Sequence, residues 1–174
     1  VDLAEINPLA QKATIAIEDS EFYNHKGIRI TSIIRAVFAN IVQGDFSQGG
    51  STLTQQIVKN TLLTKEKTVT RKIKEWIIAL KIERQMSKEK ILEIYLNDAP
   101  YGGSIYGIEE ASQSYFNKKA LDLTLGEAAY LAAIPQAPTY YSPFGNHRDK
   151  LDERKNLVLR RMKELKLISE AEYD

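Results

Sequence analysis

The sequence predicts a mainly α-helical fold, and three observations support this prediction. Apolar residues recur at the spacing of an amphipathic helix over several long segments. Ser or Thr capping pairs stand in front of several of those segments. No segment shows the alternating pattern of a half-buried strand, and the chain has no internal repeat or low-complexity linker. With 174 residues, the chain has the size of one domain, and we expect a single domain over residues 1–174.

Three helices are expected in the first half of the chain. The first covers residues 28–43, whose apolar stripe consists of Ile30, Ile33, Ile34, Val37, Phe38, Ile41 and Val42. The second begins at position 51 or 52, because Thr52 and Gln55 have the spacing of a capping box. The third covers residues 70–86, and the residues predicted to face the core are Ile73, Trp76, Ile77 and Leu80. Glu75 would then lie on the opposite face.

Four further helices are expected in the second half, over residues 87–96, 108–116, 127–134 and 151–165. Thr124 and Glu127 form a capping box at the start of the third of these. Ser169 and Glu172 have the same spacing, but the chain stops within the first turn that they would open. The chain also begins at Val1 and not at Met. We therefore expect the natural protein to continue at both ends.

The composition excludes several classes of function. The chain is 43% hydrophobic and 27% charged, as is typical of a globular protein. It has no Cys, which excludes a disulfide framework, a thiolate metal site and a Cys nucleophile. His25 and His147 are the only histidines, too few for an all-protein zinc site. No run approaches the roughly 18 apolar residues of a membrane span, and no signal peptide is present.

The charges are unevenly distributed although the formal net charge is only +1. Residues 59–90 carry ten Lys and Arg against four Glu, a net charge of +6. Residues 1–21 carry five carboxylates against one Lys, a net charge of −4. This division suits a cleft that handles an anionic substrate, and the alternative is a solvated helix face.

Glu18 is the first candidate for a catalytic residue. It follows the apolar run Ile15-Ala16-Ile17, so its side chain can lie against apolar walls. Burial disfavours the ionised form of a carboxyl group, as a general acid or base near neutral pH requires. The alternative is that Glu18 or the adjacent Asp19 caps the next helix.

A second group of candidates combines a glycine-rich turn with cations. The segment Gly49 to Gln56 places small and hydroxyl residues before a helix N-terminus, where free N–H groups favour phosphate. It is not a P-loop, because Gly-Lys-Ser/Thr is missing. Arg71 and Lys72, one turn before Glu75, could supply the charge for a diphosphate. The alternative for Glu75 is an exposed ion pair with Arg71.

Taken in order, these segments resemble the peptidoglycan glycosyltransferase domain of class A penicillin-binding proteins and their monofunctional relatives. The resemblance covers roughly residues 15–162 and rests on five blocks: Glu18-Asp19-x-x-Phe22-x-x-His25-x-Gly27, Gly49-Gly50-Ser51-Thr52-Leu53-Thr54-Gln55-Gln56-x-x-Lys59-Asn60, Arg71-Lys72-x-Lys74-Glu75, Ile91-Leu92-Glu93-x-Tyr95-Leu96-Asn97 with Tyr106-Gly107-Ile108, and Arg154-x-x-x-Val158-Leu159-x-x-Met162. The second block is highly specific.

The resemblance implies a lysozyme-like fold with a larger head lobe and a smaller, membrane-facing jaw lobe. It implies polymerisation of lipid II into β-1,4 glycan, with inversion at the donor and release of undecaprenyl diphosphate. Glu18 would be the general base and Glu75 the second carboxylate, on the donor side. The implied substrate-binding residues are Asp19, Ser51, Thr52, Gln55, Gln56, Lys59, Arg71, Lys72 and Asn97. Pro100 stands where family members have an aromatic residue, so we expect the loop after Asn97 to differ.

The resemblance also implies partners and a location. The partners are lipid II, the nascent glycan chain, the bacterial membrane and the inhibitor moenomycin, with no nucleic acid. No cofactor is obligatory, and Mg²⁺ or Mn²⁺ is an optional addition with Glu75 as its candidate ligand. The location is the extracytoplasmic face of the cell membrane, with the membrane anchor absent from this sequence. Part of the apolar stripe over residues 33–42 is expected to enter the bilayer beside Arg29 and Arg35.

The mechanism requires that Glu18 and the cations between Lys59 and Lys72 meet across a single groove. Two other functions remain open at this point. A lysozyme-like glycan hydrolase would use the same two carboxylates without a diphosphate clamp. A non-catalytic module would bind anionic lipid or nucleic acid through the basic segment alone.

Overall fold

A computed structural model describes residues 1–30, 50–61 and 68–173 of the chain. These residues form helices and no strand, which confirms the predicted mainly α fold; an isolated bridge joins Pro100 and Tyr106. The chain divides into two compact units. Unit 1 consists of residues 1–20 and 92–174, and unit 2 of residues 21–91. Nearly all of the helix expected over residues 28–43 lies outside the described residues, and the head and jaw lobes stay a prediction.

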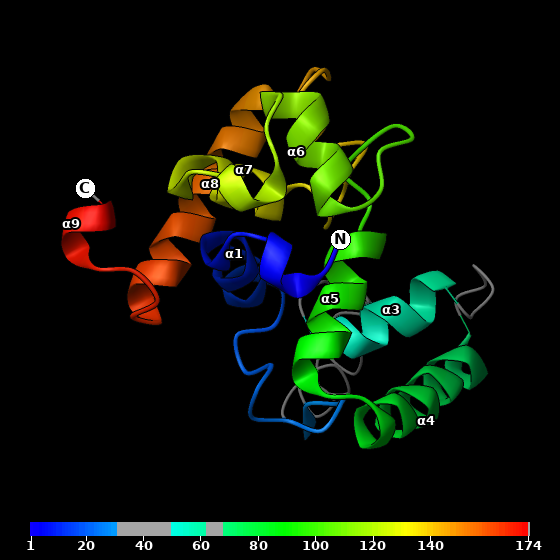
Figure 1. Ribbon diagram of the computed structural model, residues 1–174. Helices are drawn as coiled ribbons and strands as arrows, with labels where there is room; N and C mark the ends of the chain where they lie inside the picture. The colour runs from blue at the N-terminus through cyan, green and yellow to red at the C-terminus, as the bar shows by residue number, and fades with distance from the viewer. Residues whose placement is uncertain (31–49, 62–67, 174) are drawn as a thin grey trace, which may run out of the picture. The chain divides into compact units, whose positions relative to one another are not determined.

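Unit 1 is built around α1 (Pro8–Glu18), α7 (Leu125–Ala133) and α8 (Arg148–Glu164), which pack against one another (Figure 1). It also contains α6 (Ile108–Phe116), α9 (Glu170–Tyr173) and the 3₁₀ helices η1 (Leu3–Glu5) and η2 (Ala120–Asp122). Alanines on α1 and α7 allow a close approach of these two helices, and α8 contributes larger core residues. The buried residues of the three helices include Ala10, Ala13, Ala16, Ala128, Ala129, Leu151, Val158 and Met162.

Helix α1 is absent from the helices predicted above, although its first residues carry a start signal. Asn7 is the N-cap, and its side-chain oxygen accepts a hydrogen bond from Leu9 N at 2.9 Å. Pro8 occupies the first turn, where its missing N–H costs nothing. The helix ends at Glu18, and Asp19 is its C-cap. Glu18 and Asp19 thus end α1. The alternative in which one of them caps the next helix concerns residues 28–43, nearly all of which lie outside the described residues.

Unit 2 contains α3 (Leu53–Thr61), α4 (Val69–Gln85) and the beginning of α5 (Lys88–Asp98). Helix α3 packs against α4 (Figure 1). The buried residues of this unit include Phe22, Leu53, Val58, Ala79 and Ile91. Within the described part of the chain, no helix is long and apolar enough to cross a membrane.

The predicted orientation of α4 is wrong. Ile73 and Ile77 are 47% and 49% exposed, whereas Glu75 and Ala79 are buried. The buried face is held by polar pairing and close backbone packing, and not by the apolar stripe. A Cβ atom at Gly27 would lie 2.9 Å from the carbonyl oxygen of Ala79, so the loop and the helix touch at this point.

Local capping signals are confirmed at three helix starts. Thr52 N donates to Gln55 Oε1 at 2.9 Å, and Gln55 N donates back to Thr52 Oγ1 at 3.2 Å. Reciprocal hydrogen bonds of the same kind open α7 and α9, at the two pairs Thr124–Glu127 and Ser169–Glu172. The last long helix differs slightly from the prediction, because α8 begins at Arg148 and not at residue 151.

Candidate active site

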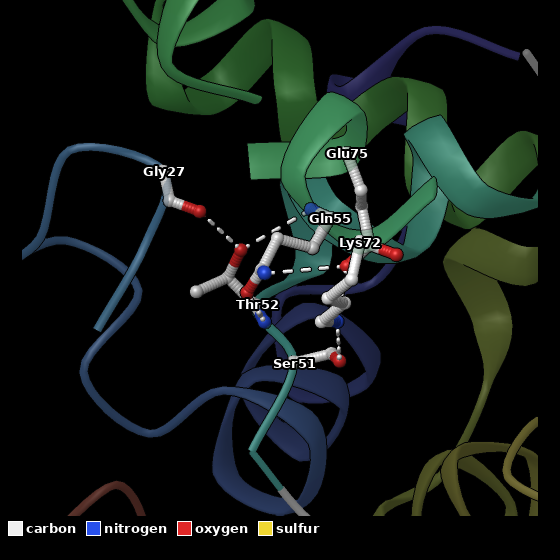
Figure 2. Close-up of polar contacts among 6 residues, drawn as sticks. All are labelled: Gly27, Ser51, Thr52, Gln55, Lys72 and Glu75. Atoms are coloured by element: carbon white, nitrogen blue, oxygen red, sulfur yellow. Dashed lines mark hydrogen bonds and ion pairs between the residues drawn. The ribbon is translucent and has the colours of Figure 1, made fainter. Parts of the chain in front are cut away.

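The start of α3 at Thr52 is fixed by hydrogen bonds within unit 2 (Figure 2). Thr52 is fully buried, and its hydroxyl donates to the carbonyl oxygen of Gly27 at 2.6 Å. The Thr52 hydroxyl also accepts from Gln55 N, so one side chain joins the turn to the loop at Gly27. The N-terminus of α3 is therefore capped by its own residues and joined to the loop at Gly27.

A buried carboxylate and a half-buried ammonium group lie beside this turn. Lys72 Nζ forms an ion pair with Glu75 Oε1 and donates to Ser51 Oγ at 3.2 Å. Gln55 Nε2 donates to the same Glu75 oxygen at 3.2 Å. Figure 2 shows Lys72 and Gln55 converging on the Glu75 carboxylate. Ser51, Thr52, Gln55, Lys72 and Glu75 are called the cradle below.

The exposures within the cradle indicate different roles for its two charged groups. The Glu75 side chain is 1% exposed, whereas the Lys72 side chain is 33% exposed. A buried carboxylate is stable only when hydrogen-bonded or paired, and Lys72 and Gln55 meet this need for Oε1. The ammonium group of Lys72 can still reach an incoming anion. The alternative for Glu75 was an exposed ion pair with Arg71. The structure instead shows a buried Glu75 paired with Lys72, one residue further along α4.

A divalent cation at Glu75 stays a prediction. Its Oε1 already faces an ammonium group, and its buried Oε2 has no hydrogen-bond partner among the described residues. Mg²⁺ and Mn²⁺ require several oxygen ligands. The described residues contain no group of three His, Cys, Asp or Glu side chains that could hold a metal ion.

Unit 2 contains a second polar cluster, centred on Glu83, that sequence reasoning missed. Glu83 accepts a hydrogen bond from the Thr54 hydroxyl at 2.5 Å and pairs with Lys88 Nζ at 2.7 Å. Lys88 Nζ also lies 4.5 Å from the centroid of the Phe22 ring. A Cβ atom at Gly27 would approach Glu83 Cγ to 3.0 Å. No local pattern could reveal this cluster, because its members come from four separate segments.

The remaining predicted binding residues of unit 2 are placed as follows. Lys59 is exposed in the last turn of α3, and Gln56 is half-buried on the same helix. Arg71 is half-buried in the first turn of α4, where its backbone N donates to the Thr68 hydroxyl at 3.1 Å. The roles of these three residues stay predictions.

Glu18 lies in unit 1, at the end of α1, beside an arginine from α8. Arg154 Nη2 is 3.6 Å from Glu18 Oε1, and the two side chains are 12% and 9% exposed. Arg154 Nε donates to the carbonyl oxygen of Ala133 at 3.0 Å, which orients the guanidinium. The predicted apolar setting of Glu18 is therefore accompanied by a cation that stabilises its charged form. Arg154 belongs to the fifth sequence block, but nothing in that block predicts its partner.

The negative charge of Glu18 contributes to raised pKa values of two buried tyrosines. Burial raises the pKa of Tyr95 well above its usual value, and the negative charge of Glu18 raises it further. The pKa of the Tyr101 hydroxyl is raised for the same two reasons. The Tyr95 hydroxyl is buried without a hydrogen-bond partner among the described residues. Glu18, Tyr95, Tyr101 and Arg154 are called the Glu18 cluster below.

Asp19 and Asn97 complete the predicted set in unit 1. Asp19 is 1% exposed directly after Glu18. The Asn97 amide accepts from the Val1 amino group at 2.9 Å and donates to the carbonyl oxygens of Val1 and Glu93 at 2.9 and 2.8 Å. These contacts join α5 to the start of the chain, and a substrate role for Asn97 stays a prediction.

The loop after Asn97 is a tight turn. Tyr101 N donates to Ile105 O at 2.9 Å, and Gly102 and Gly103 have φ values of 106° and 57°.

The expected meeting of Glu18 with the cations between Lys59 and Lys72 involves both units, and it stays a prediction.

Comparisons with known proteins agree with the motifs. A family model described as Transglycosylase matches residues 1–163. Penicillin-binding protein 1F of Bacillus subtilis (strain 168) is 49% identical over 99% of this chain and 24% of the relative. Penicillin-binding protein 1A of Aquifex aeolicus (strain VF5) is 48% identical over 93% of this chain and 22% of the relative.

A solved structure is also similar to the chain. The crystal structure of penicillin-binding protein 1A from Haemophilus influenzae matches 100% of this chain and 16% of its own, with a TM-score of 0.56 and 25% identity. The chain thus spans about a quarter of the length of the curated relatives named above, 24% and 22%. The family match and these identities confirm the resemblance seen in the motifs, and the chain belongs to the transglycosylase family.

Proposed function

We propose that the chain is a peptidoglycan glycosyltransferase domain that polymerises lipid II. The acceptor 4-hydroxyl oxygen attacks the anomeric carbon of the donor, and the bond from that carbon to the lipid diphosphate breaks. A β-1,4 bond forms with inversion, and undecaprenyl diphosphate leaves as an anion. The observation that carries the proposal is the cradle, a fixed helix start with a reachable ammonium group, in a chain of the transglycosylase family.

On the donor side, the chemical task is to hold a diphosphate and neutralise the charge that develops on it. The ammonium group of Lys72 and the Ser51 hydroxyl are suited to this task. Lys59 and Arg71 are the further cations that we assign to the clamp. Glu75 holds Lys72 and Gln55 in place from its buried position.

On the acceptor side, Glu18 takes the proton of the attacking hydroxyl. Its position at the negative end of the α1 dipole and its burial favour the protonated form, which makes it a competent base. Arg154 opposes this effect, because a nearby cation favours the ionised form of a carboxyl group. Asp19 supports the local arrangement from the adjacent buried position.

We place the reaction at the extracytoplasmic face of the cell membrane, where lipid II presents its sugars. Val69, Ile73 and Ile77 support contact with lipid, because they form an exposed apolar row on α4 with exposures of 72%, 47% and 49%. Lys74 and Lys81 are exposed on the same helix and suit anionic headgroups.

The test is incubation of the protein with lipid II and, separately, with preformed uncross-linked glycan. The proposal predicts glycan strands and undecaprenyl diphosphate from lipid II, and no shortening of the preformed glycan. Glycan shortening without polymerisation would instead identify a lysozyme-like hydrolase. Salt-sensitive binding to DNA or anionic vesicles without either reaction would identify a binding module.

A further inference from the structure

Arg154 on α8 contacts groups from other parts of unit 1. Its Nε donates to the carbonyl oxygen of Ala133, the last residue of α7, at 3.0 Å. Its Nη2 is 3.6 Å from Glu18 Oε1, and its guanidinium carbon lies over the Tyr141 ring, 5.4 Å from the centroid. The Arg154 side chain is largely buried. These contacts, and not solvent, therefore decide where the guanidinium lies.

The contacts restrict the guanidinium in different ways. The hydrogen bond to Ala133 holds one edge of the guanidinium plane. The approach to Glu18 is too long to fix the rest of the plane, because N–H···O hydrogen bonds span about 2.7–3.2 Å. The Tyr141 ring lies within the distance of about 6 Å at which a cation is attracted to an aromatic face. The ring can therefore hold the plane in the orientation that keeps Nη2 beside Glu18.

Tyr141 is itself held in place by the loop between α7 and α8. Tyr141 N donates to Ala137 O at 2.8 Å. The rings of Tyr140 and Tyr141 meet edge to face, with centroids 5.1 Å apart and an angle of 83° between the planes. Tyr140 also stacks on His147, the N-cap of α8, with centroids 4.3 Å apart. The loop thus rests on the start of the same helix that carries Arg154.

The groups around Glu18 in the described part of unit 1 leave the cationic role to Arg154. Tyr95 and Tyr101 are buried phenols, and their raised pKa values keep them neutral. Asp19 is adjacent in sequence and has the same sign of charge as Glu18. The buried residues of α7 are alanine and leucine. The position of the Arg154 guanidinium therefore has a direct effect on the charge state of Glu18.

We propose that Tyr141 is a positioning residue for the reaction, because its ring holds the Arg154 guanidinium beside the Glu18 carboxylate. The proposal rests on the function proposed above, in which Glu18 takes the acceptor proton. A guanidinium held at 3.6 Å favours the ionised carboxylate without the short, charge-assisted hydrogen bond that would compete with the incoming proton. Tyr141 exerts its effect through Arg154.

The first experiment follows the Glu18 carboxyl carbon by ¹³C NMR during a pH titration, which requires no catalytic activity. Tyr141→Leu removes the ring. We expect the midpoint of the Glu18 titration to rise by about half a pH unit, because a poorly placed cation favours the ionised form less. Tyr141→Phe keeps the ring face and should stay within about 0.2 unit of wild type. Tyr173→Leu is the matched control, since it removes a ring that lies 4.5 Å from Lys163 Nζ.

A double-mutant cycle tests whether the ring acts through the guanidinium. Arg154→Gln removes the cation and should raise the midpoint further than Tyr141→Leu does. In the Arg154→Gln background, Tyr141→Leu should add no further shift. Equal shifts in both backgrounds, or a midpoint that is unchanged or lower in Tyr141→Leu, would overturn the inference. Tyr141→pentafluorophenylalanine keeps the ring shape without its negative face, and it should raise the midpoint even if Tyr141→Leu does not fold.

The second experiment measures lipid II polymerisation by the same variants across pH. We expect the acidic limb of the kcat profile of Tyr141→Leu to move to higher pH by about the NMR shift, with KM unchanged. Polymerisation by every variant with an unmoved NMR midpoint and an unmoved acidic limb would overturn this inference and leave the proposed function intact. A raised midpoint in a protein that forms no glycan would support the contact and overturn the proposed function.

Discussion

The two carboxylates Glu18 and Glu75 are both nearly buried, but their surroundings differ. Glu75 lies in the middle of α4, where an ammonium group one turn away and a glutamine from α3 contact the same oxygen. Glu18 is the last residue of α1, and an arginine from distant α8 approaches it at 3.6 Å. Burial alone therefore does not distinguish a catalytic base from a carboxylate that positions other side chains.

The partners of each carboxylate indicate what it can do. The Glu75 carboxylate pairs with Lys72 and accepts a hydrogen bond from Gln55. It is therefore suited to keeping those two side chains in place. Glu18 combines burial and a helix C-terminus, which favour protonation, with Arg154, which favours ionisation. Such a balance suits a group that must accept a proton and release it again in every cycle.

The largest effect is expected at Glu18. We predict that Glu18→Gln lowers kcat for lipid II polymerisation by about 10²–10⁴-fold, because the amide cannot accept the hydroxyl proton. Turnover is measured as glycan formed under saturating lipid II. A variant with near-normal turnover would show that the base lies elsewhere and would remove the distinction between the two carboxylates.

A smaller effect is expected at the cation held by Glu75. Lys72→Ala should weaken binding of moenomycin, a donor mimic, by about 10- to 100-fold, because a charged hydrogen bond contributes about 1.5–3 kcal/mol. Calorimetric titration measures the affinity. Arg84→Ala is the matched control on the same helix, since Arg84 is exposed and has no assigned role. Equal affinities for wild type and Lys72→Ala would exclude Lys72 from the clamp.

The packing of unit 2 can be tested at Gly27. Its φ is 94°, and a Cβ atom would lie 2.9 Å from Ala79 O, so Gly27→Ala should lower the free energy of unfolding by about 1–3 kcal/mol. Gly126→Ala is the contrasting variant in α7 of unit 1. Nothing lies within 4 Å of its Cβ position, and we expect stabilisation of about 0.4–1 kcal/mol. Chemical denaturation measures both changes, and equal changes would contradict the described packing at Gly27.

The smallest effect is expected at Glu127, which belongs to the capping box at the start of α7 in unit 1. Burial raises the pKa of Glu127, but hydrogen bonds from Thr124 and Lys118 outweigh burial and lower it below 4.5. The stabilisation is therefore present above the unfolded-state pKa and is lost as the pH falls through the folded-state pKa. Glu127→Gln should cost about 0.5–1.5 kcal/mol at pH 7 and nothing in strong acid.

Thermal unfolding across pH measures this difference. The matched control is Glu110→Gln, an exposed residue on α6. A penalty for Glu127→Gln that persists unchanged in acid would show that the charge of Glu127 does not contribute to the cap.

Local signals account for the parts of the fold that could be predicted. Thr52 with Gln55 and Thr124 with Glu127 are short-range pairs, and the structure contains both capping boxes. Helix α1 was missed because its buried face is largely alanine, which gives a weak apolar pattern, although Asn7 and Pro8 mark its start.

Long-range polar pairing accounts for what could not be predicted. The apolar stripe of α4 suggested that Ile73 and Ile77 are buried, but the buried face is set by Glu75. Its partner Gln55 belongs to another helix, and no spacing rule connects the two. The contact between Glu18 and Arg154 likewise joins opposite ends of the sequence, so it appears only in the fold.

The central claim is that Glu18 acts in proton transfer while Glu75 holds the donor clamp. The most direct measurement is the moenomycin affinity of Glu18→Gln and Glu75→Gln, determined side by side with that of the wild type. We predict that Glu18→Gln binds within about threefold of wild type and that Glu75→Gln binds at least about tenfold more weakly, since Lys72 loses its charged partner. Weakened binding in Glu18→Gln together with unchanged binding in Glu75→Gln would contradict the division of roles.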